Sequence, residues 1–467
     1  MIKQIVNKDT AAGRHPRPTL VLAATHACVA SLQICTLLPS LSGYITSREL
    51  GASGVELFGA VSVSHVGLLL WCIGLYAVAA LLSRSLCSGL AACGVPFRWL
   101  FIMLCGAGAT GGTMYASAGA GAAAAPYLIL GAHACCGLAA GASGLANTYV
   151  VYALPDPAAQ LNIHATSEAL GYILGPSLVL LARHHKSESG VIDAWGSVGL
   201  CLVAFFAALG LLTLALAEPA RPAHLNADGD GWSASEVCGW MLSSAVDLAL
   251  AFAFGIALWS LIVTLPIISL FPPSETARAV PTFFIALGCS MVCGHVGMAC
   301  VARLYDVPAG MLGLLATILL LAHDFIVVLA GQHTAMPPLA ASPMSFGLWA
   351  ALCFFAYGMM REACTRSALQ ATDGEDPAFV IGALGFLDSV GFCAAPLLVA
   401  SCLPSRALLG SGSDGADGLH AFAETRQLLQ GPTCALLVAV AVREYFVQCT
   451  GPRARWFRRH RELRGMV

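Results

Sequence analysis

The chain has 467 residues, of which 58% are hydrophobic and 10% are charged, and its net charge is −2 at neutral pH. A soluble domain carries about 25% charged residues, so these charges are too few to cover a soluble globule of this length. The composition therefore excludes a soluble protein, and the near-neutral charge gives no indication of a nucleic-acid partner. We expect an integral membrane protein, whose 48 glycines allow helices to approach closely in the bilayer.

Apolar stretches of bilayer length recur along the whole chain, because a spanning helix needs about 20 mostly apolar residues. The first six predicted spans are residues 19–41, 55–82, 97–118, 127–151, 165–182 and 195–216. The second six are residues 238–270, 281–302, 307–329, 346–360, 379–402 and 428–447. The sequence thus predicts an all-α membrane protein with about 12 transmembrane helices.

Lysine and arginine mark the cytoplasmic side of a membrane protein. If the N-terminus is cytoplasmic, 17 of the 23 Lys and Arg residues fall in cytoplasmic loops and termini. We therefore expect a multi-pass protein of the plasma (inner) membrane with both termini in the cytoplasm.

A polar segment, residues 218–237, divides the chain nearly in half and is typical of a cytoplasmic linker. The expected domains are a six-helix half at residues 1–217 and a second six-helix half at residues 238–448. A basic tail follows at residues 449–467 and includes Trp456 and Phe457 among its arginines. Directly after a span, such a tail is typical of a segment that binds anionic lipid.

Short matching motifs occur in the two halves in the same order. In the second and eighth spans, Ser64-His65-Val66-Gly67 matches Gly294-His295-Val296-Gly297. In the fifth and eleventh, Ala169-Leu170-Gly171 matches Ala383-Leu384-Gly385. Each match is short, but the conserved order along the chain indicates a parallel repeat of six helices, an architecture found in secondary transporters.

With this topology the chain resembles the major facilitator superfamily. Gly171-x-x-x-Gly175-Pro176 in the fifth span is similar to the G-x-x-x-G-P signature that antiporters of that family often carry. Two glycines on one helix face allow tight contact with a neighbouring helix, and Pro176 kinks the helix. The alternative interpretation is an ordinary Gly/Pro packing site.

The loop signature of the family is only partly present. Between the eighth and ninth spans, Asp306 and Gly310 match it with one residue too many between them. Between the second and third spans, residues 83–95 include Arg84 but no acidic residue. In the family this loop is thought to latch the inward and outward states. The resemblance therefore implies either a different latch or a bundle that does not cycle as a transporter.

Ionisable side chains inside a membrane are costly to bury and are functional candidates. Asp388 lies nine residues into the eleventh predicted span, about 14 Å deep at the helical rise. It is the first candidate for a proton-coupling carboxylate or a cation contact, the alternative being a helix cap. His65 and His295 occupy matching places in the repeat and could relay protons. Alternatively, each could hydrogen-bond a backbone carbonyl and stabilise the packing of its own half.

The remaining candidates are weaker. Asp247 and Glu168 lie near the cytoplasmic ends of the seventh and fifth spans, where a solvated position is an equal alternative. Spans one, seven and ten line the cavity in the resemblance, and their candidate substrate contacts are Gln33, Trp259, Trp349 and Tyr357.

The 19 cysteines are scattered through apolar segments without a CxxC pair, which is typical of small buried hydrophobic residues. Cys289, Cys293 and His295 have a spacing that matches no metal site, so no metal is expected. The sequence contains no phosphate loop, dinucleotide fingerprint or nucleophile elbow. We therefore expect neither a cofactor nor an enzyme.

Two functions remain. The first is a secondary transporter working by alternating access, in which protons drive export of a small, fairly apolar compound, in the manner of an antiporter. Its partners would be that compound, protons and lipid, and we expect a monomer. The second is a membrane sensor that binds a ligand without moving it, similar to the twelve-span membrane half of LuxR-type regulators.

Overall fold

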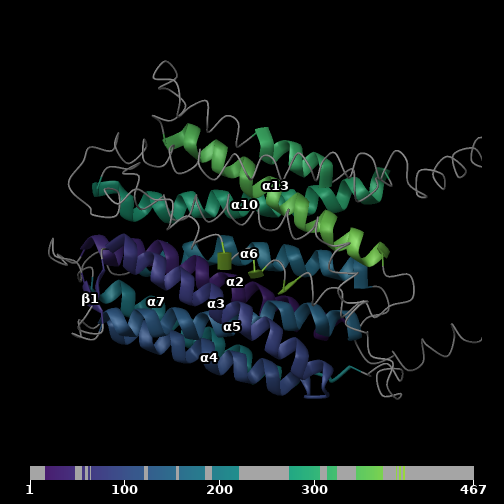
Figure 1. Cartoon of the computed structure of the whole chain (residues 1–467), viewed down its shortest axis with the longest axis horizontal. Helices are drawn as coiled ribbons and strands as arrows, with labels where there is room; N and C mark the ends of the chain where they lie inside the picture. The colour runs from purple at the N-terminus through teal and green to yellow at the C-terminus, as the bar shows by residue number, and fades with distance from the viewer. Residues whose placement is uncertain are drawn as a thin grey trace, which may run out of the picture. The chain divides into compact units, whose positions relative to one another are not determined.

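The computed structural model (Figure 1) describes part of the chain. The described ranges are residues 16–47, 55–57, 61–63, 65–119, 125–153, 157–184, 192–219, 273–305, 313–322, 343–371, 385–386, 389–390 and 393–394. The predicted seventh and twelfth spans, and most of the eleventh, lie outside these residues.

Long helices follow one another along the described chain. The first six are α2 (Pro16–Ser47), α3 (His65–Ala92), α4 (Phe97–Gly119), α5 (Ala125–Ala153), α6 (Pro157–His184) and α7 (Ile192–Thr213). They are followed by α10 (Pro273–Tyr305), a helical segment Gly313–Ala322 and α13 (Pro343–Ala371). Among the described residues, α2, α3, α5, α6, α7 and α10 each contain a stretch long and apolar enough to cross a membrane. The helices fall on predicted spans one to six, eight and ten, which confirms the predicted helical class.

The second predicted span is wrong at both ends. Residues Val55–Leu57 and Val61–Val63 form strands β1 and β2, an antiparallel hairpin in which Val55 pairs with Val63. Their alternation of apolar and polar side chains and their valines favour a strand, although hydropathy alone counted them as part of a helix. The helix then begins at His65 and continues ten residues beyond the predicted end, to Ala92.

The end of α3 is set by Gly94, which has a φ of 106°. Its N–H donates to Ala91 O at 3.2 Å, and the N–H of Val95 donates to Leu90 O at 3.0 Å. This pair of bonds is the Schellman motif, in which a glycine with positive φ closes a helix. Arg84 therefore lies within α3 and not in the loop, and the connection to α4 is only Cys93-Gly94-Val95-Pro96.

The longer α3 also changes the register of the repeat. His65 is the first residue of α3, whereas His295 lies ten residues before Tyr305, the last residue of α10. The position ten residues before the end of α3 is Leu82. The two histidines are therefore not equivalent along their helices, and His65 does not lie at the middle of a span. A four-residue match carries too little information to fix a register in a glycine-rich chain.

The tenth predicted span, 346–360, is shorter than the helix that contains it. Helix α13 runs from Pro343 to Ala371 and includes Arg361, Glu362 and Arg366. These charged residues are good helix formers, so the helix continues where the apolar stretch ends.

The chain forms two compact units. Unit 1 comprises Met1–Gly231, Pro273–Cys289 and Thr372–Ser389, and unit 2 comprises Trp232–Pro272, Ser290–Ala371 and Val390–Val467. In unit 1, helices α2 to α7 pack side by side (Figure 1).

Glycines bring helix backbones together within unit 1. A Cβ on Gly141 of α5 would collide with the Ser83 side chain of α3, and one on Gly137 would collide with Tyr76 O. Higher numbers on α5 thus meet higher numbers on α3, so these two helices run parallel. Helices α4 and α7 run antiparallel, because Gly108 meets Phe206 whereas Gly112 lies against Gly199. Spans that are two apart in the chain should run parallel, as α3 and α5 do. Spans that are three apart should run antiparallel, as α4 and α7 do.

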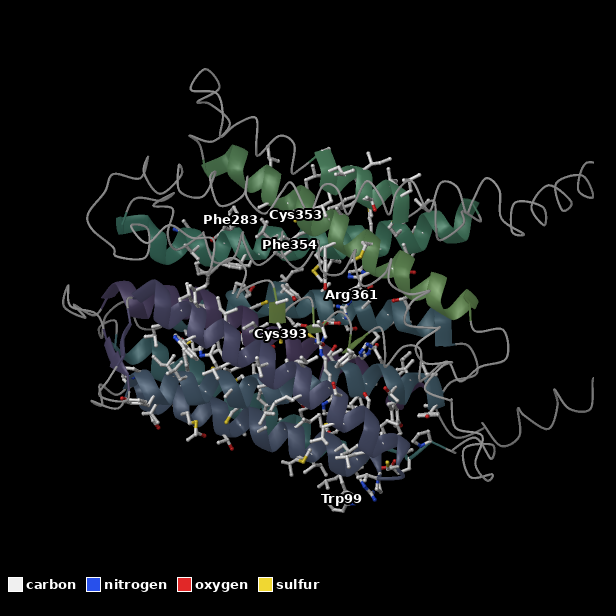
Figure 2. All side chains as sticks on the ribbon, viewed as in Figure 1. Trp99, Phe283, Cys353, Phe354, Arg361 and Cys393 are labelled. Carbon is white, nitrogen blue, oxygen red and sulfur yellow. The ribbon has the colours of Figure 1, made fainter. Side chains whose placement is uncertain are left out.

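The N-terminus of α4 is capped by a residue from beyond α7. Both Glu218 carboxylate oxygens accept bonds from the first turn of α4, from Phe97 N at 3.0 Å and from Arg98 N at 2.9 Å. Trp99, in the same turn, is 55% exposed and projects away from the bundle (Figure 2), with the Arg98 guanidinium 5.7 Å from its ring centre. An exposed Trp is typical of the membrane–water interface.

We expect Glu218→Ala to lower the stability of the protein by about 1 kcal/mol, because two N–H groups at a helix N-terminus lose a charged acceptor. The midpoint of thermal unfolding in detergent measures this loss. Glu218→Gln keeps one acceptor oxygen and should lie between the wild type and Glu218→Ala. Equal midpoints for all three proteins would contradict the capping role.

Candidate functional site

The glycine signature of α6 lies against the backbone of α2. A Cβ on Gly175 would lie 2.6 Å from Leu32 O and 2.9 Å from Cys35 C, and one on Gly171 would collide with Cys28 O. Because Gly171 meets the earlier part of α2 and Gly175 the later part, the two helices run parallel. Pro176 follows inside the helix and has no N–H to donate to the preceding turn. The sequence predicted this close contact, and the structure identifies α2 as its partner.

Five amide, imidazole or carboxyl side chains are buried in the described part of unit 1. They are His26, Gln33, His133, His164 and Glu168. In a bilayer such groups need partners, because each unsatisfied polar group costs several kcal/mol. Their partners therefore distinguish groups that hold the bundle together from groups available for chemistry.

Gln33 of α2, a predicted substrate contact, is fully buried. Its Nε2 donates to Cys136 O of α5 at 2.6 Å, while its Oε1 has no partner among the residues that the structure describes. The Tyr76 side chain of α3 interacts with the Gln33 amide. Gln33 thus joins three helices and presents one acceptor oxygen that a ligand with a donor group could use.

His26 holds helices together. Its Nε2 lies 2.8 Å from the Thr213 hydroxyl of α7, and its ring stacks on Phe101 of α4 with centroids 4.1 Å apart. His133 of α5 bonds its own helix through Nδ1, which lies 2.9 Å from Ile129 O. Both histidines have structural partners.

His164 and Glu168 of α6 are buried one helical turn apart, with 1% and 5% of their surfaces exposed. Glu168 was a sequence candidate, and the structure buries it. His164 was not predicted. Its position four residues before Glu168 and seven before Gly171 places all three on one helix face, and that spacing was the signal that could have indicated it.

Unit 2 places two of the candidates in its interior. His295 of α10 and Tyr357 of α13 are each 1% exposed. The helices meet beside them, since a Cβ on Gly358 would lie 2.5 Å from Met291 O and 3.1 Å from His295 N. Cys353, Phe354 and Arg361 follow the same helix (Figure 2), with Cys353 and Phe354 fully buried.

The remaining candidates are not tested by side-chain contacts. Asp388, Asp247, Trp259, Asp306 and Gly310 lie outside the described residues. His65 and Trp349 lie in α3 and α13, of which only the backbone is described at these positions.

Metal-binding groups are dispersed in the part of the chain that the structure describes. Cys289 and Cys293 are exposed whereas His295 is buried. The described residues contain no cluster of three His, Cys, Asp or Glu side chains that could hold a metal ion.

The structure is similar to solved transporters over nearly its whole length. The human organic anion transporter MFSD10 (TETRAN) matches with a TM-score of 0.63 at 17% identity, covering 91% of this chain and 100% of that chain. A D-xylose–proton symporter matches with a TM-score of 0.64 at 12% identity, covering 92% and 97%. The Major Facilitator Superfamily transporter FucP, in its outward conformation, matches with a TM-score of 0.56 at 15% identity, covering 92% and 99%.

No known family profile and no curated protein match the sequence. The structural likeness nevertheless covers more than 90% of the chain with TM-scores above 0.5, and this establishes the fold. The protein is a multi-pass integral membrane protein with a major-facilitator-like fold, as the sequence predicted.

Proposed function

We propose that this protein is a secondary active transporter that works by alternating access and couples proton movement to the export of a small, fairly apolar compound. The observation that carries the proposal is the contact of Gly171 and Gly175 with the α2 backbone, followed by Pro176. In the resemblance this signature belongs to antiporters. The solved structures with the same fold include an organic anion transporter and a proton symporter by name.

The character of the substrate follows from the interior of unit 1. Its described buried surface is mostly apolar, with few charged groups. Gln33 Oε1, which has no partner among the described residues, supplies one acceptor. This mostly apolar interior supports an apolar compound over a sugar, which needs many polar contacts. We keep Asp388 as the first coupling carboxylate, with His65, His295, Asp247, Glu168, Trp259, Trp349 and Tyr357 as further candidates.

The proposed setting is a monomer in the plasma (inner) membrane with both termini in the cytoplasm. Residues 1–217 and 238–448 would be the two rocking halves, residues 218–237 their linker, and residues 449–467 a tail that binds anionic lipid. This placement rests on the distribution of lysine and arginine.

One observation favours the sensor instead. The connection between α3 and α4 has four residues, Cys93-Gly94-Val95-Pro96, and none is charged. The family's latch uses charged groups at this loop. In this chain Arg84, inside α3, donates to the Ser389 hydroxyl at 2.9 Å, next to Asp388 in sequence. A contact of this kind would serve as the latch in the transporter, whereas a sensor needs none.

Flux measurements separate the two functions. The protein is reconstituted in liposomes that contain a pH-sensitive dye, and tetraphenylphosphonium or ethidium is added. We expect cation-dependent proton movement in the wild type and none in Asp388→Asn, because that variant loses the titrating carboxylate. Asp193→Asn, in the first turn of α7, is the control and should behave as the wild type. Binding of either cation without proton movement would contradict the transporter and favour the sensor.

A further inference from the structure

An arginine lies inside the apolar part of α3. Arg84 belongs to the stretch Leu68–Ala91 that is apolar and long enough to cross the membrane, and it lies seven residues before the end of that stretch. At the helical rise this position is about 10 Å into the span. A charged side chain at such a depth is costly and marks a candidate binding site.

The contacts of Arg84 hold its side chain between parts of unit 1. A Cβ on Gly144 of α5 would lie 3.2 Å from Arg84 Cγ, so the aliphatic stem lies against α5. Arg84 Nη1 donates to the Ser389 hydroxyl at 2.9 Å, and Arg84 Nε is buried. The residue as a whole is half-buried, so part of its surface is accessible to a ligand.

Tyr76 links Arg84 to the buried amide of Gln33. Tyr76, two helical turns earlier on α3, lies within electrostatic range of Arg84 and interacts with the Gln33 amide of α2. Tyr76 is 7% exposed and Gln33 is fully buried. Gln33 Nε2 donates to Cys136 O, whereas its Oε1 has no partner among the described residues. Helices α2 and α3 thus bring a guanidinium, a phenol and an amide into one apolar interior.

The helices that hold Arg84 carry positive charge. The charged residues of α2, α3, α4 and α5 are all arginines, and these four helices contain no Asp or Glu. Helix α6 contributes one carboxylate, Glu168, and Asp193 of α7 lies in its first turn, outside the apolar span. The electrostatic potential around Arg84 therefore favours an anion over a cation.

A carboxylate fits this arrangement better than a cation or a neutral group does. The guanidinium presents its N–H groups in a planar fork that matches the two oxygens of a carboxylate. A carboxylate beside Arg84 gives a pair of zero net charge, which is much less costly inside a membrane protein than a lone charge. The mostly apolar interior of unit 1 accepts an apolar body attached to that carboxylate.

We propose that Arg84 binds the carboxylate of the transported compound, which is therefore an apolar organic acid. The proposal rests on the proposed function and names its substrate class. Arg84 supplies the charge and the hydrogen-bond donors, Gly144 leaves room for its stem, and Tyr76 lies beside the bound acid group.

Three probes with the same apolar body separate the charge of a ligand from its shape. They are 2-naphthoate, 2-naphthamide and 2-naphthylmethylammonium, which are negative, neutral and positive at neutral pH. The unfolding midpoint of the purified full-length protein in detergent reports their binding, because a ligand of the folded state raises it. We expect the wild type to bind naphthoate about tenfold or more tightly than the amide, as for hydrogen bonds to a charged group, and to bind the ammonium least.

Replacement of Arg84 should change the binding of the acid alone. Arg84→Gln should bind naphthoate no better than the amide, and the amide as the wild type does. Arg84→Lys keeps the charge but not the planar fork, so it should bind naphthoate less tightly than the wild type and still better than the amide. Arg98→Gln is the matched control, because it removes an arginine of α4 that lies over the exposed ring of Trp99. It should bind all three probes as the wild type does.

Equal binding of naphthoate and the amide by the wild type would overturn the proposal, and so would binding of none of the probes. A preference for naphthoate that persists in Arg84→Gln would also overturn it. If Arg84 serves only as a latch, its replacement changes the binding of all three probes alike. If Arg84→Gln does not give a single peak on size exclusion, the wild type and Arg84→Lys decide.

Proton movement in liposomes tests the proposed transport separately. There 2-naphthalenesulfonate, a permanent anion, replaces naphthoate, which crosses lipid as the neutral acid. We expect it to cause proton movement in the wild type. Binding of naphthoate through Arg84 without proton movement for any compound keeps the binding site and refutes the transporter. Proton movement with tetraphenylphosphonium but no preference for naphthoate keeps the transporter and refutes the acid as its substrate, so the two failures are distinguishable.

Discussion

Gly171→Ala and Gly175→Ala are expected to destabilise the protein by about 2–3 kcal/mol each, the upper range for overpacking a close contact. The added Cβ at Gly175 would lie 2.6 Å from Leu32 O, and the one at Gly171 would collide with Cys28 O. These obstacles are backbone atoms, which cannot rotate away as a flexible side chain would. Helices α2 and α6 must therefore separate, and in a bilayer their contact depends on close packing. Unfolding of the purified protein by heat or denaturing detergent measures the loss.

Gly74→Ala is the matched control. It makes the same substitution in the middle of α3, where a new Cβ meets no atom within 4 Å. Alanine is a better helix former than glycine by about 0.8–1.0 kcal/mol, so this variant should be as stable as the wild type or more so. If all three variants unfold at the same point, the close approach of α2 and α6 is refuted.

The sequence predicted the helices better than their ends. Hydropathy reports how much apolar chain can lie in lipid, and it located every described helix. It cannot report where hydrogen bonding begins and stops. The residues Val55–Val63 are apolar enough for a span but form a hairpin, and α3 continues past Arg84 to the glycine at position 94. The end of a helix depends on local backbone geometry, which a hydropathy average over a window of residues does not report.

The sequence predicted which types of residue belong to the candidate site better than it predicted where they lie. Gln33 was selected because span one lines the cavity in the resemblance. The structure buries it and gives its Oε1 no partner among the described residues. His164 was missed because the predicted fifth span begins at residue 165, one residue after it. Only the packing of α2 over α6 shows that this end is buried. Which face of a helix is covered depends on its neighbours, and a single sequence does not specify them.

The contact between α10 and α13 within unit 2 should show the same dependence on glycine. We expect Gly294→Ala to destabilise the protein by about 2–3 kcal/mol, because the new Cβ would collide with Phe355 O of α13 and overpack the contact. Gly297→Ala, one turn further along α10, has nothing within 4 Å and should be neutral or slightly stabilising. The two variants differ only in which face of α10 receives the methyl group. A comparison of their unfolding midpoints therefore isolates the contact from helix propensity.

A comparison of Gly294→Ala with Gly137→Ala also tests the repeat, through the stability that each variant loses. In the predicted repeat, α10 and α13 correspond to α3 and α5, which are likewise joined through Gly137 and Gly141. If Gly137→Ala and Gly294→Ala lose similar stability, each half depends on the same glycine contact between its second and fourth helices. A loss at Gly137 alone would show that the halves share their topology but not their means of packing. His295 is next to Gly294, so such a difference would also indicate that its surroundings have diverged from the corresponding part of α3.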